Sequence, residues 1–97
     1  MQLIRNKFYQ KKEQKFFKKH PNLLDKYANI LKKLGSNPSE QILRLHKLQG
    51  KLKDFHAVSL NYEYRIILLI NILDDRIVLV DIGTHDEVYL GKSSTTT

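Results

Sequence analysis

The run "YRIILLIN", residues 64 to 71, constrains the fold more than any other part of the chain. Apolar side chains occupy both of its alternating sets of positions, and such a strand must be covered on both faces, as at the centre of a sheet. Two similar runs flank it, at residues 55–60 and 76–83, with short separators between them. Separators of this length favour hairpins, so the three strands are predicted to be antiparallel to one another.

The N-terminal half of the chain has the period of helices. Residues 7–19 predict one helix, and a second is expected to start at Pro21 and to stop at Gly35. Residues 2–6 predict a short first strand. Two helices joined at a proline favour a hairpin whose apolar stripe needs a sheet to cover it. The sequence therefore predicts an α+β fold of order β-α-α-β-β-β, with both helices on one face of the sheet and a last helical turn at 84–90.

Length and composition limit the class of protein. The 97 residues suit one domain, which we place at residues 1–91, followed by a disordered tail at 92–97. The chain has no cysteine, and its four scattered histidines match no familiar zinc spacing, so neither a metal nor a cofactor is expected. No apolar run has the length of a membrane span, and the N-terminus lacks the features of a signal peptide. We expect a soluble cytoplasmic protein with no membrane partner.

The charge is unevenly distributed along the chain. Seventeen Lys and Arg against ten Asp and Glu give a net charge of +7. Residues 1–53 hold 14 basic and 3 acidic side chains, a balance of +11, whereas residues 54–97 hold 3 and 7, a balance of −4. A basic half of this kind indicates a polyanionic partner, either nucleic acid or an acidic protein. The alternative interpretation is a lysine-rich surface that is merely solvated.

The last regular stretch, "GTHDEVYL" at residues 83–90, combines a helix start with an unexplained histidine. Thr84 and Glu87 have the spacing of a capping box, in which each side chain binds a free backbone N–H group at the start of a helix. Local chemistry does not explain His85, which would lie in the first turn beside two acids. His85 is therefore either an exposed residue without a role or part of a functional site.

Two more residues are candidates for an anion-binding site. Arg65 opens an almost wholly apolar strand, where its guanidinium needs water or an anionic partner, and an ion pair with Glu63 or Asp81 is the structural alternative. His46 is expected in a loop rich in lysine, in the stretch "LHKLQGKLK". These loop residues could share a phosphate site, or they could simply be solvated.

Three short motifs, in this order and at this spacing, resemble the RelE/ParE superfamily of bacterial toxins, and among them the YafQ-like branch. The motifs are "L-x-G-x-L" at residues 48–52, "YR" at 64 and 65, and "GTH-x-x-x-Y" at 83–89. The resemblance covers most of the chain, from the two helices to Tyr89. It implies a small twisted antiparallel sheet with two N-terminal helices, in agreement with the predicted order of elements.

The resemblance also implies an activity, the metal-independent cleavage of messenger RNA by the toxin of a type II toxin–antitoxin system, usually on the ribosome. In this chemistry a base takes the proton of the ribose 2′-OH, the oxygen attacks the adjacent phosphate, and an acid protonates the departing 5′-oxygen. By match to the family motifs, His85 would be the general acid and His46 the general base, with Glu63 competing for the base role. Arg65 would stabilise the phosphorane. The residues that would bind substrate are Tyr89, Lys51, Lys53 and Tyr64.

The chain departs from the branch at two positions. Ser59 stands where YafQ-like enzymes have a second histidine, and Asp81 stands where they have an arginine just before "GTH". Arg65 is expected to replace the missing cation. Two alternatives therefore stay open: a ParE-type toxin that inhibits DNA gyrase without cleaving nucleic acid, and a degenerate member kept for antitoxin binding.

The resemblance also implies partners. They are a cognate antitoxin protein, messenger RNA, the ribosome through its RNA, and operator DNA reached only through the antitoxin. The toxin alone is expected to be a monomer.

Overall fold

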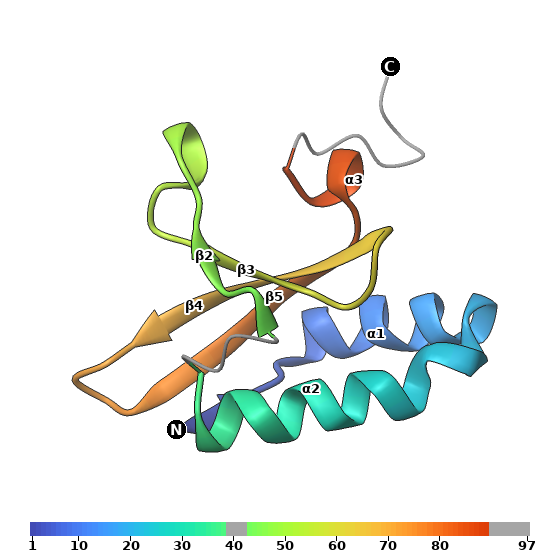
Figure 1. The fold of residues 1–97 in the computed structure, drawn as a ribbon, viewed down its shortest axis with the longest axis horizontal. Helices are drawn as coiled ribbons and strands as arrows, with labels where there is room; N and C mark the ends of the chain where they lie inside the picture. The colour runs from blue at the N-terminus through green and yellow to red at the C-terminus, as the bar shows by residue number, and fades with distance from the viewer. Residues whose placement is uncertain (39–42, 90–97) are drawn as a thin grey trace.

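The computed structural model of the chain describes residues 1–38 and 43–89 and has the predicted α+β fold (Figure 1). The predicted helix at 7–19 and the predicted strand at 64–71 have the bounds expected from the sequence. The tail predicted at 92–97 lies outside the described residues. In chain order the elements are β1 (Gln2–Ile4), α1 (Lys7–Lys19), the 3₁₀ helix η1 (Pro21–Leu23), α2 (Leu24–Ser36), β2 (His46–Lys47), the 3₁₀ helix η3 (Gly50–Leu52), β3 (His56–Ser59), β4 (Tyr64–Asn71), β5 (Arg76–Thr84) and α3 (His85–Tyr89).

The five strands form one sheet in the order β1-β5-β4-β3-β2. Strand β4 is antiparallel to β3 and to β5, as predicted, and β2 is antiparallel to β3. Strand β1 runs parallel to β5, with Leu3 opposite Ile77. The sheet is therefore mixed, because the chain leaves β1 through two helices before it returns, and such a crossover permits a parallel pair. Strand β2 was expected to be part of a loop. Its two residues pair with β3, so His46 lies on the far edge of the sheet from β1.

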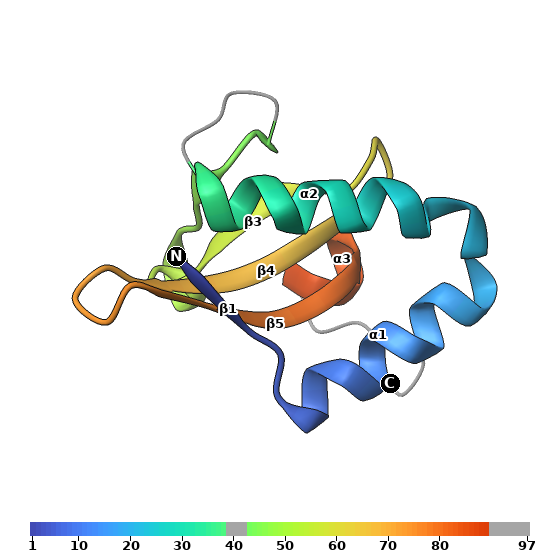
Figure 2. The same cartoon turned by 90° about the horizontal axis from the view of Figure 1, so that it is seen from below.

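Both faces of β4 are buried, as the sequence predicted. Figures 1 and 2 show α1 and α2 on one side of the sheet and α3 on the other. Ile66 and Leu68 pack in the main core with the two long helices, whereas Ile67 packs with Val88 of α3 in a smaller cluster. None of the helices within the described ranges has the length and apolar character needed to cross a bilayer.

A buried polar network joins the start of α1 to α2. The Tyr27 hydroxyl donates a hydrogen bond to Glu13, so the Tyr9 hydroxyl, 2.7 Å away, donates to Tyr27. The Glu13 carboxylate also accepts from Nε of Arg5 at 3.0 Å and pairs with its Nη2. Burial raises the pKa of both tyrosines well above that of free tyrosine, so the two hydroxyls keep their protons at physiological pH. The network thereby satisfies a carboxylate that is almost fully buried beneath α1.

We expect Tyr27→Phe to lower the free energy of unfolding by about 1–3 kcal/mol, because it leaves the Tyr9 hydroxyl without its acceptor and removes one of the donors to Glu13. Tyr62→Phe is the matched control, since the Tyr62 side chain is 98% exposed and its loss should change stability by less than about 0.5 kcal/mol. Urea unfolding followed by circular dichroism measures both. Equal effects in the two variants would contradict a structural role for the network.

Candidate functional site

Three of the predicted site residues, His46, Arg65 and His85, belong to elements at the sheet face opposite α1 and α2. In the sheet register Ser59, Arg65 and Gly83 are neighbours on three adjacent strands. Because side chains alternate along a strand, Arg65 lies on the same face as Ile67, the face that α3 partly covers. Figure 1 shows the segment containing β2 and η3 on one side of this face and α3 on the other. The structure therefore brings His46 and His85 to opposite borders of one surface with Arg65 between them.

The spacing of strands gives the scale of this surface. His46 is opposite Ala57, and Ala57 is opposite Ile67, two residues along β4 from Arg65. Strands lie about 4.8 Å apart and residues rise about 3.4 Å along a strand, so the Cα atoms of His46 and Arg65 are roughly 12 Å apart. Two long side chains can reach a single phosphodiester from positions at that separation.

His46 is held in a defined orientation at the sheet edge. Its Nδ1 atom lies 3.0 Å from the carbonyl oxygen of Arg44. A carbonyl can only accept, so Nδ1 carries the hydrogen and Nε2 of the neutral ring keeps its lone pair. This tautomer is the one that a general base requires, and His46 is exposed on the short edge strand β2.

Arg65 is anchored by backbone carbonyls instead of by an acid. Its Nη1 atom donates to the carbonyl oxygens of Asn61 at 2.9 Å, Tyr64 at 3.1 Å and Tyr62 at 3.3 Å. In the described part of the chain neither of the ion pairs considered from the sequence forms, and Asp81 pairs instead with Lys12 of α1 at 3.2 Å. The guanidinium is thus fixed through one nitrogen, and no acidic side chain within residues 1–38 and 43–89 pairs with it.

The start of α3 confirms the predicted capping box. The Thr84 hydroxyl accepts from the Glu87 N–H at 3.3 Å, and the Glu87 carboxylate accepts from the Thr84 N–H at 2.9 Å. His85 follows the cap and is exposed, with Nδ1 3.4 Å from the carboxylate of Asp86. Tyr89 ends α3, and its side chain lies outside what the structure describes.

The remaining predicted residues occupy three different places. Lys51 lies in η3 and Lys53 follows it directly; both are exposed and belong to the segment that follows His46 of β2. Glu63 is exposed in the turn before β4. Tyr64 lies on the helix side of β4, with its ring centroid 4.9 Å from that of Phe16, so it is not on the face of Arg65. Desolvation, followed by the carboxylates of Glu63 and Glu87, raises the pKa of Tyr64 and keeps its hydroxyl protonated.

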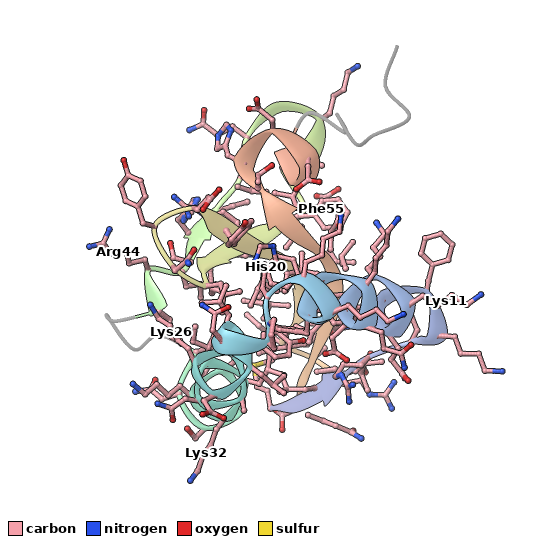
Figure 3. All side chains as sticks on the ribbon, turned by 90° about the vertical axis from the view of Figure 1, so that its right-hand side faces the viewer. Lys11, His20, Lys26, Lys32, Arg44 and Phe55 are labelled. Atoms are coloured by element: carbon pink, nitrogen blue, oxygen red, sulfur yellow. The ribbon has the colours of Figure 1, made fainter. Side chains whose placement is uncertain are left out.

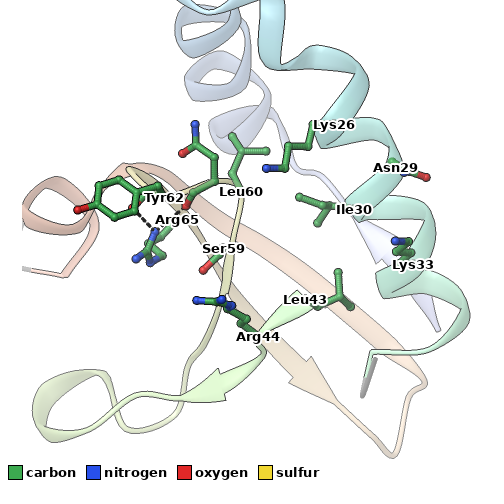
Figure 4. Close-up of a pocket in the computed structure, with 11 residues that line it drawn as sticks. Lys26, Asn29, Ile30, Lys33, Leu43, Arg44, Ser59, Leu60, Tyr62 and Arg65 are labelled. Carbon is green, nitrogen blue, oxygen red and sulfur yellow. Dashed lines mark hydrogen bonds between the residues drawn. The ribbon is translucent and has the colours of Figure 1, made fainter. Parts of the chain in front are cut away.

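The structure also places basic residues together that the sequence patterns did not single out. A pocket of about 540 Å³ lies between α2 and the segments around Arg44 and Arg65 (Figure 4). From α2 it receives Lys26 and Lys33, whose spacing of seven residues puts them on one face of the helix. The spacing of Lys26 and Lys33 could have indicated a basic helix face from the sequence, although the apolar stripe of the same helix is the stronger pattern. We call this space the cation pocket. Within the described residues no group of three or more His, Cys, Asp or Glu side chains could hold a metal ion.

Comparison with solved structures identifies the fold. E. coli YafQ is similar over 90% of this chain and 96% of its own, with 17% identity and a TM-score of 0.74. A metal-bound toxin from Helicobacter pylori is similar over 91% and 98%, with 23% identity and a TM-score of 0.72. A chain of the YoeB–YefM complex from Staphylococcus aureus is similar over 87% of this chain and 93% of its own, with 21% identity and a TM-score of 0.64. No family model matches the sequence, and no curated protein matches it at a significant level.

The fold is therefore that of small bacterial toxins of the RelE/ParE type, as the sequence motifs predicted. Among these structures the chain is similar over almost its whole length to YafQ and to the Helicobacter pylori toxin, with which it shares this fold.

We expect Gly83→Ala to weaken the start of α3. A Cβ atom at this position would lie 2.9 Å from the Glu87 carboxylate oxygen and 3.4 Å from its Cβ, so Glu87 must leave the cap. Loss of a cap costs about 1 kcal/mol. Gly35→Ala is the matched control, because a Cβ there meets only an ordinary contact of 3.5 Å and an alanine favours the helix.

Urea unfolding of both glycine variants, alone and combined with Glu87→Ala, measures this coupling. The cost of Gly83→Ala should shrink once the Glu87 side chain has been removed. An unchanged cost in that background would show that the glycine is required for another reason.

Proposed function

We propose that this protein is the toxin of a type II toxin–antitoxin pair and that it cleaves messenger RNA. The observation that carries the proposal is the arrangement of one sheet face, with His46 at one border, His85 at the other and Arg65 between them, which pairs with no acid among the described residues. The same fold occurs in toxins, and one of them is recorded in a YoeB–YefM complex. A cognate antitoxin that covers this face is the partner we infer.

The proposed cleavage uses the imidazoles of His46 and His85 and the guanidinium of Arg65. Nε2 of His46 would accept the proton of the ribose 2′-OH, whose oxygen then attacks the adjacent phosphorus and expels the 5′-oxygen. An imidazolium at His85 would give its proton to that leaving oxygen. The fixed guanidinium of Arg65 would stabilise the charge that develops on the phosphorane, and it needs no reorganisation because its Nη1 is already bound. Glu63 is the competing base.

The two departures from the branch are compatible with this scheme. Asp81 is neutralised by Lys12, so it does not present a free negative charge to a substrate phosphate. Ser59 is the cross-strand neighbour of Arg65 and is too small to obstruct it. Arg65 would supply the cation that the branch places before "GTH".

The lysines of the two long helices give a surface for ribosomal RNA. Figure 3 shows Lys11 and Lys32 extending outward from α1 and α2. Contacts of this kind with phosphates are independent of sequence and sensitive to salt, as docking on a large RNA requires.

We predict that His85→Ala abolishes growth inhibition and lowers the rate of messenger RNA cleavage by about 10²- to 10⁴-fold, the contribution of a general acid. Its melting temperature should not change, because the side chain is exposed. Induction in bacteria measures toxicity, and mapping of new 5′ ends after incubation with translating ribosomes measures cleavage. Unchanged toxicity would remove His85 from the site. Inhibition of gyrase without cleavage would instead identify a ParE-type toxin.

The same cleavage assay separates the two candidate bases. His46→Ala should cause a loss comparable with that of His85→Ala, whereas Glu63→Ala should retain most of the activity. The reverse order would assign the base role to Glu63.

Replacing Arg65 tests the role of the cation. Arg65→Lys keeps the charge but loses the planar fork, and we expect the cleavage rate to fall by about 10²-fold or more. Arg76→Lys is the control, since Arg76 is exposed at the opposite end of the same pair of strands. Rapid-quench measurement under single-turnover conditions gives the rate, and thermal melting checks the fold. A loss of stability large enough to explain the lost activity would make Arg65 a structural residue.

A further inference from the structure

The cation pocket is a second surface, distinct from the face that holds the two histidines. Figure 4 shows its two walls: Lys26, Asn29 and Lys33 project from α2, and Arg44, Ser59 and Arg65 lie across from them. Leu60 and Ile30 supply an apolar floor. The pocket is therefore a groove between α2 and the end of β3 that lies beyond its pairing with β2.

The described residues that line the pocket carry charge of one sign. Four of the eleven residues that line it are basic, and none of those described as lining it is acidic. Four cations around about 540 Å³ repel one another, and such a cluster costs stability unless an anion lies between them. The hydroxyl of Ser59 and the amide of Asn29 add hydrogen-bond donors of the kind that phosphate oxygens accept.

Arg44 lines the pocket with a backbone conformation that costs free energy. Its φ angle is +52°, in the left-handed region that residues other than glycine seldom adopt. Its side chain lines the pocket, and its carbonyl oxygen receives the hydrogen bond from His46. One strained residue thus connects the pocket with the proposed general base.

Two features favour a nucleic acid over an acidic protein segment. Arg65 belongs both to the pocket and to the candidate site, so an RNA strand bound at the site passes directly into the pocket. Tyr62 stands at the rim with its ring 98% exposed, where a nucleobase can stack on it. An acidic peptide would use the cations but would gain little from an exposed aromatic ring.

We propose that the cation pocket binds the phosphodiester backbone of single-stranded RNA next to the cleaved nucleotide, with Lys26, Lys33 and Arg44 on the phosphates and Tyr62 against a base. The inference rests on the proposed ribonuclease function and names a subsite for its substrate.

The test measures binding without cleavage. A fluorescent single-stranded RNA with 2′-O-methyl groups cannot supply the attacking 2′-OH, so its affinity reports binding alone. Anisotropy titrations over a series of KCl concentrations should give a log–log slope that is smaller by about 1.4 for Lys26→Gln/Lys33→Gln, because each phosphate contact to a single strand contributes about 0.7. Arg76→Gln is the control: it removes an exposed cation at the end of β5 far from the pocket and should leave the slope unchanged.

Two single variants separate the parts of the proposal. Arg44→Gly should weaken RNA binding without lowering the melting temperature, because glycine adopts the left-handed conformation freely. Tyr62→Ala should weaken binding about tenfold at every salt concentration with no change in slope. Unchanged affinity in Tyr62→Ala would overturn the stacking contact.

Other outcomes overturn the assignment of the pocket. An unchanged slope in Lys26→Gln/Lys33→Gln, or a decrease in Arg76→Gln as large per charge removed, would show that the pocket holds no phosphates of its own. Loss of poly-L-glutamate binding with RNA binding intact would assign it to an acidic protein segment. An equal loss with double-stranded RNA of the same length would assign it to folded RNA such as that of the ribosome. Failure of the cleavage predictions for His85 would leave these binding results standing, so the two proposals can fail separately.

Discussion

The burial of β4 on both faces determines the rest of the structure. Its helix-side residues, Ile66 and Leu68, enter the main core, whereas Ile67 needs the small cover that α3 provides. Because α3 is only five residues long, it covers this second face at one place. The remainder of the face is left to polar residues such as Ser59 and Arg65. A surface that can bind a charged substrate is thus the consequence of covering one strand unequally.

An irregularity in the pairing of β4 with β5 adapts the strands to this arrangement. Ile67 pairs with Asp81, but Leu68 pairs with Leu79, so Val80 is an extra residue on β5. A bulge of this kind re-aims the side chains that follow it and increases the local twist. Ile82 consequently stays in the helix-side core, and Asp81 reaches Lys12 of α1. The bulge therefore allows the Asp81 carboxylate to pair with Lys12.

The sequence predicted what periodicity and local chemistry determine. The α1 helix, the central strand and the capping box at Thr84 and Glu87 depend on neighbours a few residues apart, and all three occur as expected. The parallel pairing of β1, the two residues of β2 and the pairing of Asp81 depend on which segments meet in space. No local pattern carries that information. The left-handed conformation of Arg44 is a non-glycine exception for which the sequence has no signal.

The turn before β4 shows how one residue can prepare both binding surfaces. The Asn61 side chain accepts from the N–H groups of Glu63 at 2.9 Å and Tyr64 at 2.8 Å, the geometry by which asparagine stabilises turns. Its carbonyl oxygen accepts from Arg65 at 2.9 Å. These hydrogen bonds hold the turn and also the guanidinium that belongs to both the candidate site and the cation pocket. A cation fixed in this way loses little conformational entropy on binding, so more of its attraction for a phosphate is retained as affinity. Asn61 thus contributes to both surfaces by holding a residue that they share.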